Sequence, residues 1–358
     1  MRQRGERIDL GRLGQLTGAI ARERKMVMTD TSTTSATDNT AAGVRVRGFR
    51  AGDGPLLAES WTRAAPGDPI GYQRFRDLVL LDRNFDPAGL QVAEVDGVPA
   101  GAAYAVRRLI PEAGSDLQPE TGWIGFFFVD PRAQRRGIGR RLITAALDWL
   151  RARGCRTVFF SPTTPNYFLP GLDADRYPAA DALLRELGFE THYQAVAMDR
   201  SLNDYALPGE VRDQLDRLAA DGYRFDSPTS DELPGLINIA GDAFNADWAR
   251  GIREAVVGGL PLDRIVAVFD PAGEPLGWAM HGTYEQVPER FGPFGVLPTK
   301  RGLGLGKMLL HLTLERMRAA GCHSAWFLWT DTKSAAGQLY LKTDFTVTRT
   351  FTIMKAGL

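Results

Sequence analysis

The sequence predicts an α/β protein built from two copies of one domain, and three observations lead to this prediction. The glycine pair Gly137 and Gly139 recurs as Gly304 and Gly306, so the two patterns stand 167 residues apart. Around both pairs, segments with strand and helix periodicity follow in the same order. The chain has 358 residues, enough for about two domains, and its 44% hydrophobic content is ordinary for a protein with a buried core.

The first copy contains a hairpin, a strand, the glycine loop, a helix and another strand. The turn at Asp96-Gly97 joins two strands, and an apolar run that begins at Trp123 predicts a third. Leu142 and Leu147 fall on one face of the predicted helix, and Gly154 is suited to end it. The predicted ranges are 91–95 and 101–106 for the hairpin, 123–129 for the strand, 138–153 for the helix and 157–160 for the next strand.

The second copy repeats this order, with one difference after its fifth strand. The predicted ranges are 264–269 and 276–281 for the hairpin, 291–296 for the strand, 305–320 for the helix and 324–329 for the next strand. The first copy carries about 11 extra residues between its fifth strand and its last helix, within 161–178. This insert contains Tyr167, Gly171 and Tyr177.

The two copies predict a division of the chain into four parts. Residues 1–43 form a disordered N-terminal extension, because the tract at 29–40 is too polar to bury a core. Copy one spans 44–200, a linker spans 201–221, and copy two spans 222–358. Met28 stands at the start of the polar tract, so either Met1 or Met28 is a possible natural start.

Composition favours a cytoplasmic protein without a metal. Lys plus Arg and Asp plus Glu are 43 each, so net charge gives no reason to expect binding to nucleic acid or to an acidic membrane. No run of 18 apolar residues exists, which predicts no membrane span. The two cysteines, Cys155 and Cys322, stand at equivalent places in the copies and are expected to pack in the cores. The four histidines show no zinc-site spacing.

The glycine loop of each copy predicts a phosphate site. A strand, a glycine loop and a helix N-terminus present unpaired backbone N–H groups in one direction, and the helix dipole adds partial positive charge there. Neighbouring arginines, such as Arg135 and Arg301, add cations. A Walker loop needs Ser or Thr where Met308 stands, and a dinucleotide fingerprint needs its first glycine directly after the strand.

The pattern Gln/Arg-x-x-Gly-x-Gly resembles the pyrophosphate-binding motif of the GNAT superfamily, the acetyl-CoA-dependent N-acetyltransferases. The resemblance covers both copies. It implies, for each, a mixed and mostly antiparallel sheet flanked by helices, in which the fourth and fifth strands splay apart to admit acetyl-CoA as the co-substrate. The residues so implied in copy two are Val296, Arg301, Gly302, Leu303, Gly304, Leu305, Gly306 and Lys307. Those in copy one are Val129, Gln134, Arg135, Arg136, Gly137, Ile138, Gly139 and Arg140.

The resemblance also places catalysis in copy two. The family's last helix has the pattern Ala-x-x-Leu-Tyr, which Ala336 to Tyr340 match, and this assigns Tyr340 as the general acid toward the thiolate. Lys333 and Asp344 depart from the family's Asn and Gly. Copy one has Leu184 at the tyrosine position, so we expect it to bind CoA or to be structural; Tyr167 and Tyr177 are lesser candidates for its acid.

The general base and the acceptor are less well indicated. Glu289 precedes the fourth strand of copy two and is the first candidate for the base. Glu285, His281, Asp331 and an ordered water are further candidates.

We expect the acceptor to be an amine on a small molecule or a peptide, and the sequence does not identify it. A non-catalytic acyl-CoA-binding or sensing protein is the alternative function.

Overall fold

The structure is a computed structural model that describes residues 43–111, 117–163 and 166–358. Except for Gly43, the extension predicted at 1–43 lies outside the described residues. The predicted elements occur in both copies, with ends that differ from the predicted ones by a few residues. The boundaries at 200 and 222 stay predictions.

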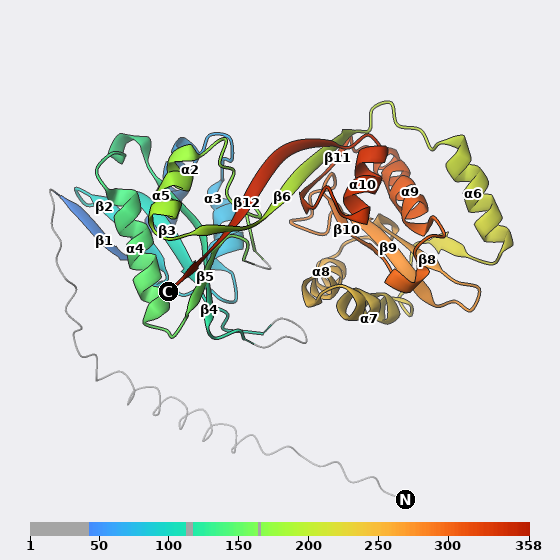
Figure 1. Ribbon diagram of the computed structural model, residues 1–358, viewed down its shortest axis with the longest axis horizontal. Coiled ribbons are helices and arrows are strands. Elements are labelled where there is room, and N and C mark those ends of the chain that lie inside the picture. Colours follow the sequence, from blue (N-terminus) through green and yellow to red (C-terminus); the bar gives the residue numbers. More distant parts are fainter. Residues whose placement is uncertain (1–42, 112–116, 164–165) are drawn as a thin grey trace, which may run out of the picture. The chain divides into compact units, whose positions relative to one another are not determined.

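In its described residues, copy one has six strands and the helices between them (Figure 1). Its strands are β1 (Val44–Gly48), β2 (Leu90–Val95), β3 (Val98–Val106), β4 (Thr121–Val129), β5 (Thr157–Phe160) and β6 (Glu190–Ser201). Its helices are α2 (Asp53–Ala64), α3 (Tyr72–Phe75), a π-helical turn η1 (Arg76–Leu80), a 3-10 turn η2 (Pro131–Ala133), α4 (Ile138–Arg151) and α5 (Pro178–Glu186).

Copy two repeats the plan after a helix, α6 (Gly209–Ala220), which occupies the predicted linker. Its strands are β7 (Arg224–Asp226), β8 (Ile265–Phe269), β9 (Pro275–His281), β10 (Phe291–Val296), β11 (Ser324–Thr330) and β12 (Thr346–Gly357). Its helices are α7 (Leu233–Ala243), α8 (Ala246–Val257), 3-10 turns η3 (Leu262–Arg264) and η4 (Pro298–Lys300), α9 (Leu305–Ala319) and α10 (Ala335–Lys342).

The two copies exchange their last strands. One sheet has the order β1-β2-β3-β4-β5-β12-β6-β11, and a second has the order β10-β9-β8-β7. Strand β12 of copy two therefore lies between β5 and β6 of copy one, and β6 pairs in turn with β11 of copy two. Figure 1 shows β6 and β12 side by side along their length. This exchange leaves no signal in the sequence, because each copy still has a last strand of its own.

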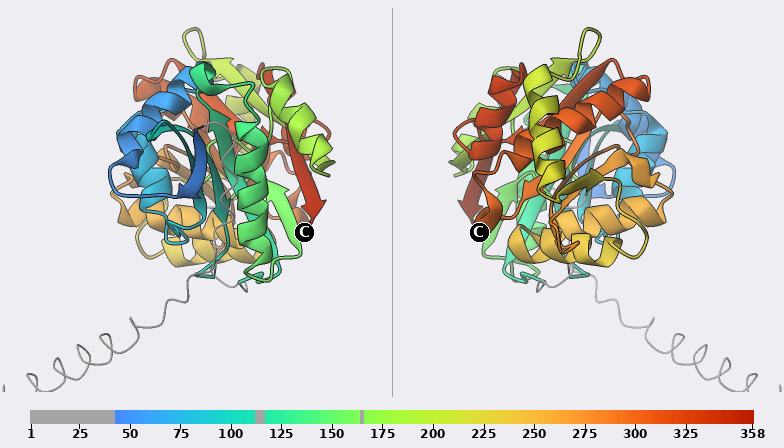
Figure 2. Two further views of the ribbon diagram at one scale, coloured as in Figure 1. Left: turned by 90° about the vertical axis from the view of Figure 1, so that its left-hand side faces the viewer. Right: turned by 90° about the vertical axis from the view of Figure 1, so that its right-hand side faces the viewer.

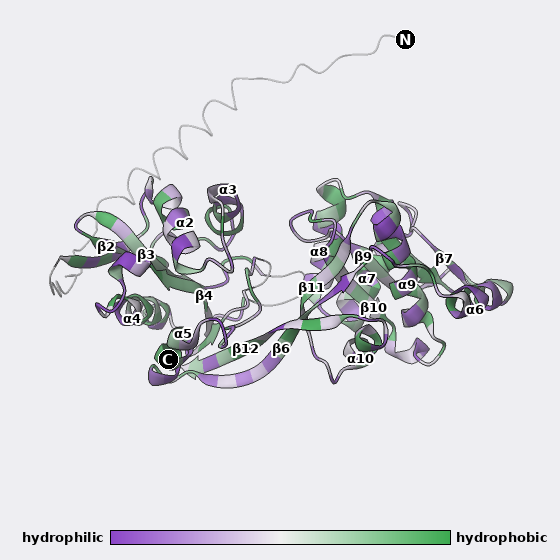
Figure 3. Ribbon diagram, turned by 90° about the horizontal axis from the view of Figure 1, so that it is seen from above, coloured by the Kyte–Doolittle hydropathy of each residue, from purple (hydrophilic) through white to green (hydrophobic). Residues whose placement is uncertain are grey.

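Each sheet carries helices on both faces, and the strands alternate between two cores. In copy one, Ala103 and Ala105 on β3 face a core with α4, whereas Ala102 and Tyr104 face a core with α2. Figure 2 (left) shows α2 in blue and α4 in green on opposite sides of the strands. Figure 3 shows β4 as largely hydrophobic and the first half of β6, whose side chains are exposed, as more hydrophilic.

Candidate functional site

Strands β4 and β5 of copy one separate partway along their length. They pair in parallel from Thr121 to Ile124, where β5 ends at Phe160. Strand β4 continues to Val129 beside β3, and its register shifts between Ile124 and Phe126, which makes Gly125 a β-bulge. The chain after Phe160 turns away, so the continuing part of β4 faces an opening instead of a neighbouring strand.

The glycine loop lies beyond the end of β4 and leads into α4. Gly137 immediately precedes the helix with φ 72° and ψ 6°, a left-handed conformation that favours glycine. Within the described part of the chain, no side chain caps this helix, so its first backbone N–H groups remain available to an anion. Of the nearby cations, the Arg140 guanidinium pairs with Glu186.

A cavity of about 530 Å³ occupies the opening in copy one. The predicted copy-one residues that line it are Val129, Gln134, Arg135, Gly137, Ile138, Gly139 and Arg140; Arg136 is the one predicted there that is absent from its wall. The opposite wall comes from the insert and from α5, with Leu172, Tyr177 and Leu183. The insert therefore forms part of the wall of the cavity that the glycine loop borders.

The cavity passes through the sheet from one core to the other. Ile138 and Phe160 in its wall belong to the core on the α4 face, and Trp61 and Phe168 belong to the core on the α2 face. The opening between β4 and β5 thus connects the glycine loop to a chamber beside α2. Such a passage allows one ligand to enter from each side and the two to meet at the bulge.

The chamber beside α2 has an aromatic wall and a polar corner. The ring of Trp61 lies 4.7 Å from that of Phe126 and 4.8 Å from that of Phe168. In the corner, the Tyr177 hydroxyl donates to Asp68 Oδ2 (2.6 Å), and Arg349 from β12 donates to both oxygens of the same carboxylate. Sequence reasoning missed Asp68 and Arg349, because they are far apart in the chain and neither belongs to a motif.

Burial and hydrogen bonding shift the pKa values of Asp68 and Tyr177 in this corner. Burial raises the pKa of Asp68, but the hydrogen bonds from Arg349 and Tyr177 outweigh it and leave the pKa below its usual value. Burial, and then the hydrogen bond to Asp68, raise the pKa of Tyr177 well above its usual range. At neutral pH the carboxylate is therefore ionised and the phenol keeps its proton.

The equivalent strands of copy two, β10 and β11, belong to different sheets. An isolated parallel bridge joins Arg290, just before β10, to Trp326, whose N–H donates to the Glu289 carbonyl (3.0 Å). Aromatic rings pack in the space. The ring of Tyr340 lies 4.5 Å from that of Phe327 and 6.0 Å from that of Phe294. Tyr340 is 6% exposed, and burial raises its pKa, so it stays protonated.

The glycine loop of copy two has the backbone of its counterpart but has a helix against it. Gly304 has φ 77° and ψ 3°, close to the values of Gly137. Helix α6 adds Gln214, whose Nε2 donates to the Leu303 carbonyl (3.2 Å), and Glu210, which pairs with Lys307 (2.5 Å). Of the other predicted residues, Val296 ends β10, Arg301 and Gly302 precede Gly304, and Leu305 and Gly306 begin α9.

The candidates for the base have structural contacts. Glu289 is half-buried at the bridge, where its backbone carbonyl accepts from Trp326. Glu285 pairs with Arg74 and Arg290, and buried His281 donates from Nδ1 to the Pro288 carbonyl (2.8 Å). Burial lowers the pKa of His281.

The remaining candidates also have structural contacts. Asp331 accepts from the Lys333 N–H (2.8 Å) at the start of α10. The Tyr167 hydroxyl accepts from Arg290 (3.3 Å). Leu184 is fully buried in the core of copy one. Cys155 and Cys322 are both buried and unbridged.

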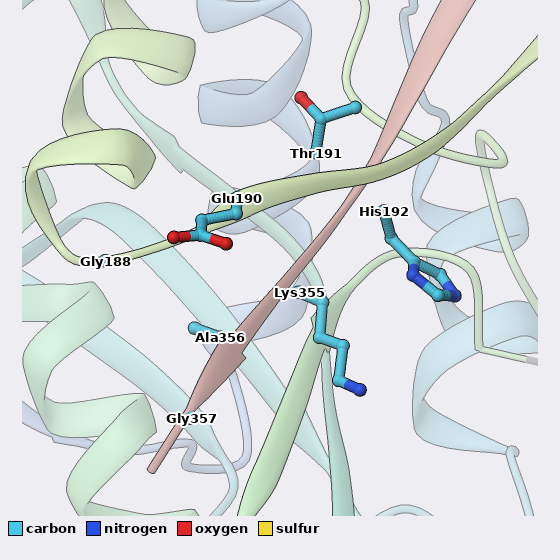
Figure 4. Close-up of a pocket in the computed structure, with 7 residues that line it drawn as sticks. All are labelled: Gly188, Glu190, Thr191, His192, Lys355, Ala356 and Gly357. Atoms are coloured by element: carbon cyan, nitrogen blue, oxygen red, sulfur yellow. The ribbon is translucent and has the colours of Figure 1, made fainter.

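A second hollow, of about 390 Å³, lies where β6 and β12 pair. Figure 4 shows His192 and Lys355 on one side of the strands and Thr191 on the other. None of the residues predicted from the sequence lines it. Among the described residues, no group of three acidic, histidine or cysteine side chains is placed to hold a metal ion. In the same ranges, no helix has the length and apolarity that a membrane span requires.

Comparison with solved structures supports the fold. The glucosamine N-acetyltransferase region of a fungal GH3 β-N-acetylglucosaminidase has a TM-score of 0.75 at 16% identity, over 91% of this chain and 39% of that one. A GCN5-related N-acetyltransferase from Sphaerobacter thermophilus has 0.66 at 14% identity, over 88% and 96%. A tandem GNAT protein from the clavulanic acid pathway has 0.60 at 15% identity, over 88% and 98%.

Sequence relatives and a family profile agree with that likeness. The mycothiol acetyltransferase of Cellulomonas flavigena is 37% identical over 125 residues, and that of Rhodococcus erythropolis is 33% identical over 119. These matches cover 32% and 33% of this chain, and 35% and 36% of the relatives, so they span about a third of either relative. The profile of the acetyltransferase (GNAT) family matches residues 56–168 and 234–345, more than half of the chain. The chain therefore belongs to the acetyltransferase (GNAT) family, and it carries two of the family's domains in tandem.

Proposed function

We propose that the protein is an N-acetyltransferase that moves an acetyl group from acetyl-CoA to a primary amine, and that acetyl-CoA binds in copy one. The cavity through the sheet of copy one carries this proposal. It joins a helix N-terminus suited to a pyrophosphate to a length of β4 that has no neighbouring strand. The edge of β4 after the bulge, where no strand of the described residues pairs and the Val129 carbonyl accepts from Gln134 Nε2 (3.0 Å), is suited to hydrogen-bond the amide groups of the pantetheine arm.

The geometry also supports transfer at the bulge. The backbone of Gly125 faces the passage, so a thioester that follows β4 from the glycine loop reaches the chamber beside α2. An amine near pKa 10.4 must lose a proton before it attacks, which costs roughly 4–5 kcal/mol at pH 7. The thiolate that leaves has a thiol pKa near 8.5, so water is able to protonate it where Leu184 offers no proton.

Copy two is a second candidate location for acetyl transfer, and the phenol of Tyr340 favours it. Tyr340 stands on the last helix beside the separated strands, and its raised pKa keeps the proton that a general acid donates. In this placement the loop 301–307 holds acetyl-CoA and Glu289 is the proposed base. It requires the contacts of α6 with Leu303 and Lys307 to be compatible with the bound pyrophosphate.

The test of the activity is an assay of the full chain with acetyl-CoA and a panel of amines. The panel comprises aromatic and aliphatic primary amines, an amino sugar, an aminoglycoside, and peptides with a free N-terminus or a lysine. Release of the CoA thiol measures turnover, and mass spectrometry of the products identifies N-acetylation. Acetyl-CoA binding by calorimetry without turnover of any amine would instead support the alternative of an acyl-CoA-binding or sensing protein.

A further inference from the structure

The last strand of copy two contributes an arginine to the cavity corner of copy one. Arg349 donates from Nη1 to Asp68 Oδ1 (2.6 Å), from Nη2 to Asp68 Oδ2 (3.0 Å) and from Nε to Asp173 Oδ2 (2.7 Å). The guanidinium is therefore held in one orientation by two carboxylates, which a planar fork of donors matches well. Its side chain is 12% exposed and that of Asp173 is 4% exposed.

The hydrogen bonds of Arg349 with Asp68 and Asp173 hold part of the cavity wall in place, in addition to orienting the guanidinium. Asp68 and Asp173 both line the cavity, one after α2 and the other within the insert. Beside them, Leu172 and Thr352 exchange backbone hydrogen bonds of 2.9 and 2.8 Å, which join the insert to β12. The insert that distinguishes copy one is thus positioned by a strand of copy two.

Tyr177 lines this corner of the cavity together with Asp68, Asp173 and Arg176. Its hydroxyl donates to Asp68 Oδ2 (2.6 Å), so the lone pairs of its oxygen are what it offers to a ligand. Because Arg349 and Tyr177 keep Asp68 ionised, the direction of this hydrogen bond is fixed at neutral pH. A phenol in that state accepts a hydrogen bond and is a poor proton donor.

Tyr177 also lies at the junction of the two ends of the passage. Its ring packs against the core on the α4 face, which includes the wall residues Ile138 and Phe160. Its hydroxyl reaches Asp68, whose backbone carbonyl accepts from Trp61 Nε1 (2.9 Å) on the α2 side. A group that binds the Tyr177 oxygen therefore lies between the glycine-loop end and the aromatic wall.

We propose that Tyr177 accepts an N–H of the acceptor amine, that Asp68 orients Tyr177, and that Arg349 positions Asp68. One N–H held by Tyr177 leaves the lone pair of a neutral amine, whose extra proton has passed to water, free to attack the thioester carbon. As the C–N bond forms and the C–S bond breaks, the new amide loses one N–H proton to water, and water protonates the leaving thiolate. The rings of Trp61, Phe126 and Phe168 then favour an amine on an apolar body. The acceptor site of copy one is therefore complete only when β12 of copy two is in place. This inference rests on the proposed function and on transfer in copy one.

The experiment uses the full chain, acetyl-CoA and 2-phenylethylamine, a primary amine with an apolar body. In Tyr177→Phe and Arg349→Met, we expect the KM for the amine to rise about tenfold, because one oriented hydrogen bond is lost. The acetyl-CoA Kd, measured by calorimetry, should change less than twofold, since the glycine loop is untouched. Arg349→Lys keeps the charge and should recover part of the KM.

A matched control separates positioning from stability. Arg250 is 15% exposed and, like Arg349, pairs with two carboxylates, those of Asp247 and Glu254. Arg250→Met should lower the melting temperature as Arg349→Met does, without a change in the amine KM. An unchanged amine KM in folded Tyr177→Phe would overturn the inference. So would acetyl-CoA binding to the wild type without acetylation of 2-phenylethylamine, whereas failure to bind acetyl-CoA overturns the proposed function itself.

Discussion

The two copies have the same order of elements and nearly the same backbone at their glycine loops, yet they differ at the separation of the fourth and fifth strands. In copy one the insert stands back from β4 and a cavity lies between them. In copy two the rings of Phe294, Phe327 and Tyr340 are packed together at that place, and α6 lies against the loop. The same order of strands and helices therefore leaves an open passage in copy one, where the insert forms a wall, and a packed core in copy two, where aromatic side chains meet.

The largest expected effect is on the free energy of unfolding. It compares the two places, one in each copy, where the fourth and fifth strands separate. Phe160 and Phe327 are equivalent and equally buried, each 7% exposed. Phe327 contacts three aromatic rings, whereas Phe160 contacts one and borders the cavity. We expect Phe327→Ala to cost about 3–5 kcal/mol in unfolding free energy, and Phe160→Ala roughly 1–3 kcal/mol less. Urea unfolding measures both, and equal losses would contradict the packed description of copy two.

A second effect, nearly as large, is a sensitivity to acid that belongs to copy two. Burial lowers the pKa of His311 to about 4, and its Nδ1 lies 2.9 Å from the Tyr205 hydroxyl; copy one has Thr144 at this position. Because the unfolded state binds the proton more readily, stability is full above about pH 6.5 and is lost as pH falls toward 4. The loss reaches about 3 kcal/mol.

Urea unfolding at several pH values, with His311→Gln beside the wild type, measures this sensitivity. The variant should lose less stability than the wild type between pH 6.5 and 4.5. Parallel pH profiles of the two proteins would show that His311 does not cause the loss.

A third prediction compares the two loops by placing an acidic side chain at the second residue of each following helix. An aspartate there suits the helix dipole, and its charge repels a pyrophosphate. Its Cβ would lie 3.3 Å from the Leu183 side chain at Gly139 and 3.4 Å from the Phe294 ring at Gly306, so the neighbouring side chain must shift slightly at either position. Gly139→Asp should weaken acetyl-CoA binding about 100-fold, and Gly306→Asp should have little effect. Calorimetry on the full chain checks this, and the opposite ranking would move acetyl-CoA to copy two.

The smallest expected effect, that of Tyr340→Phe on kcat, distinguishes most sharply between acetyl transfer in copy one and acetyl transfer in copy two. Tyr340→Phe keeps the ring and its packing and removes only the hydroxyl. Transfer in copy one predicts an unchanged kcat. Transfer in copy two, with Tyr340 as the general acid, predicts a fall of about 10²–10⁴-fold. Steady-state kinetics with the best amine of the panel decides between them.

The repeat made most of the fold predictable, because strand and helix periodicity are local properties of the sequence. The strand at Phe291–Val296 and the helix that begins at Leu305 occur as expected. The exchange of β6 and β12 was not predictable, since the same residues form the same strands in either pairing. The corner of Asp68, Tyr177 and Arg349 was not predictable for a related reason: it is assembled by that exchange, and of these three residues the sequence singles out only Tyr177. The roles of Tyr340 and Glu289 stay predictions.

Hydrogen–deuterium exchange of the full chain with and without acetyl-CoA shows most directly whether the ligand binds in copy one. We expect slower exchange of backbone N–H groups in the loop 134–140 and in β4 after the bulge, where the ligand would cover them. We expect no change in the loop 301–307. Protection confined to 301–307 and β10, with none in copy one, would contradict binding in copy one.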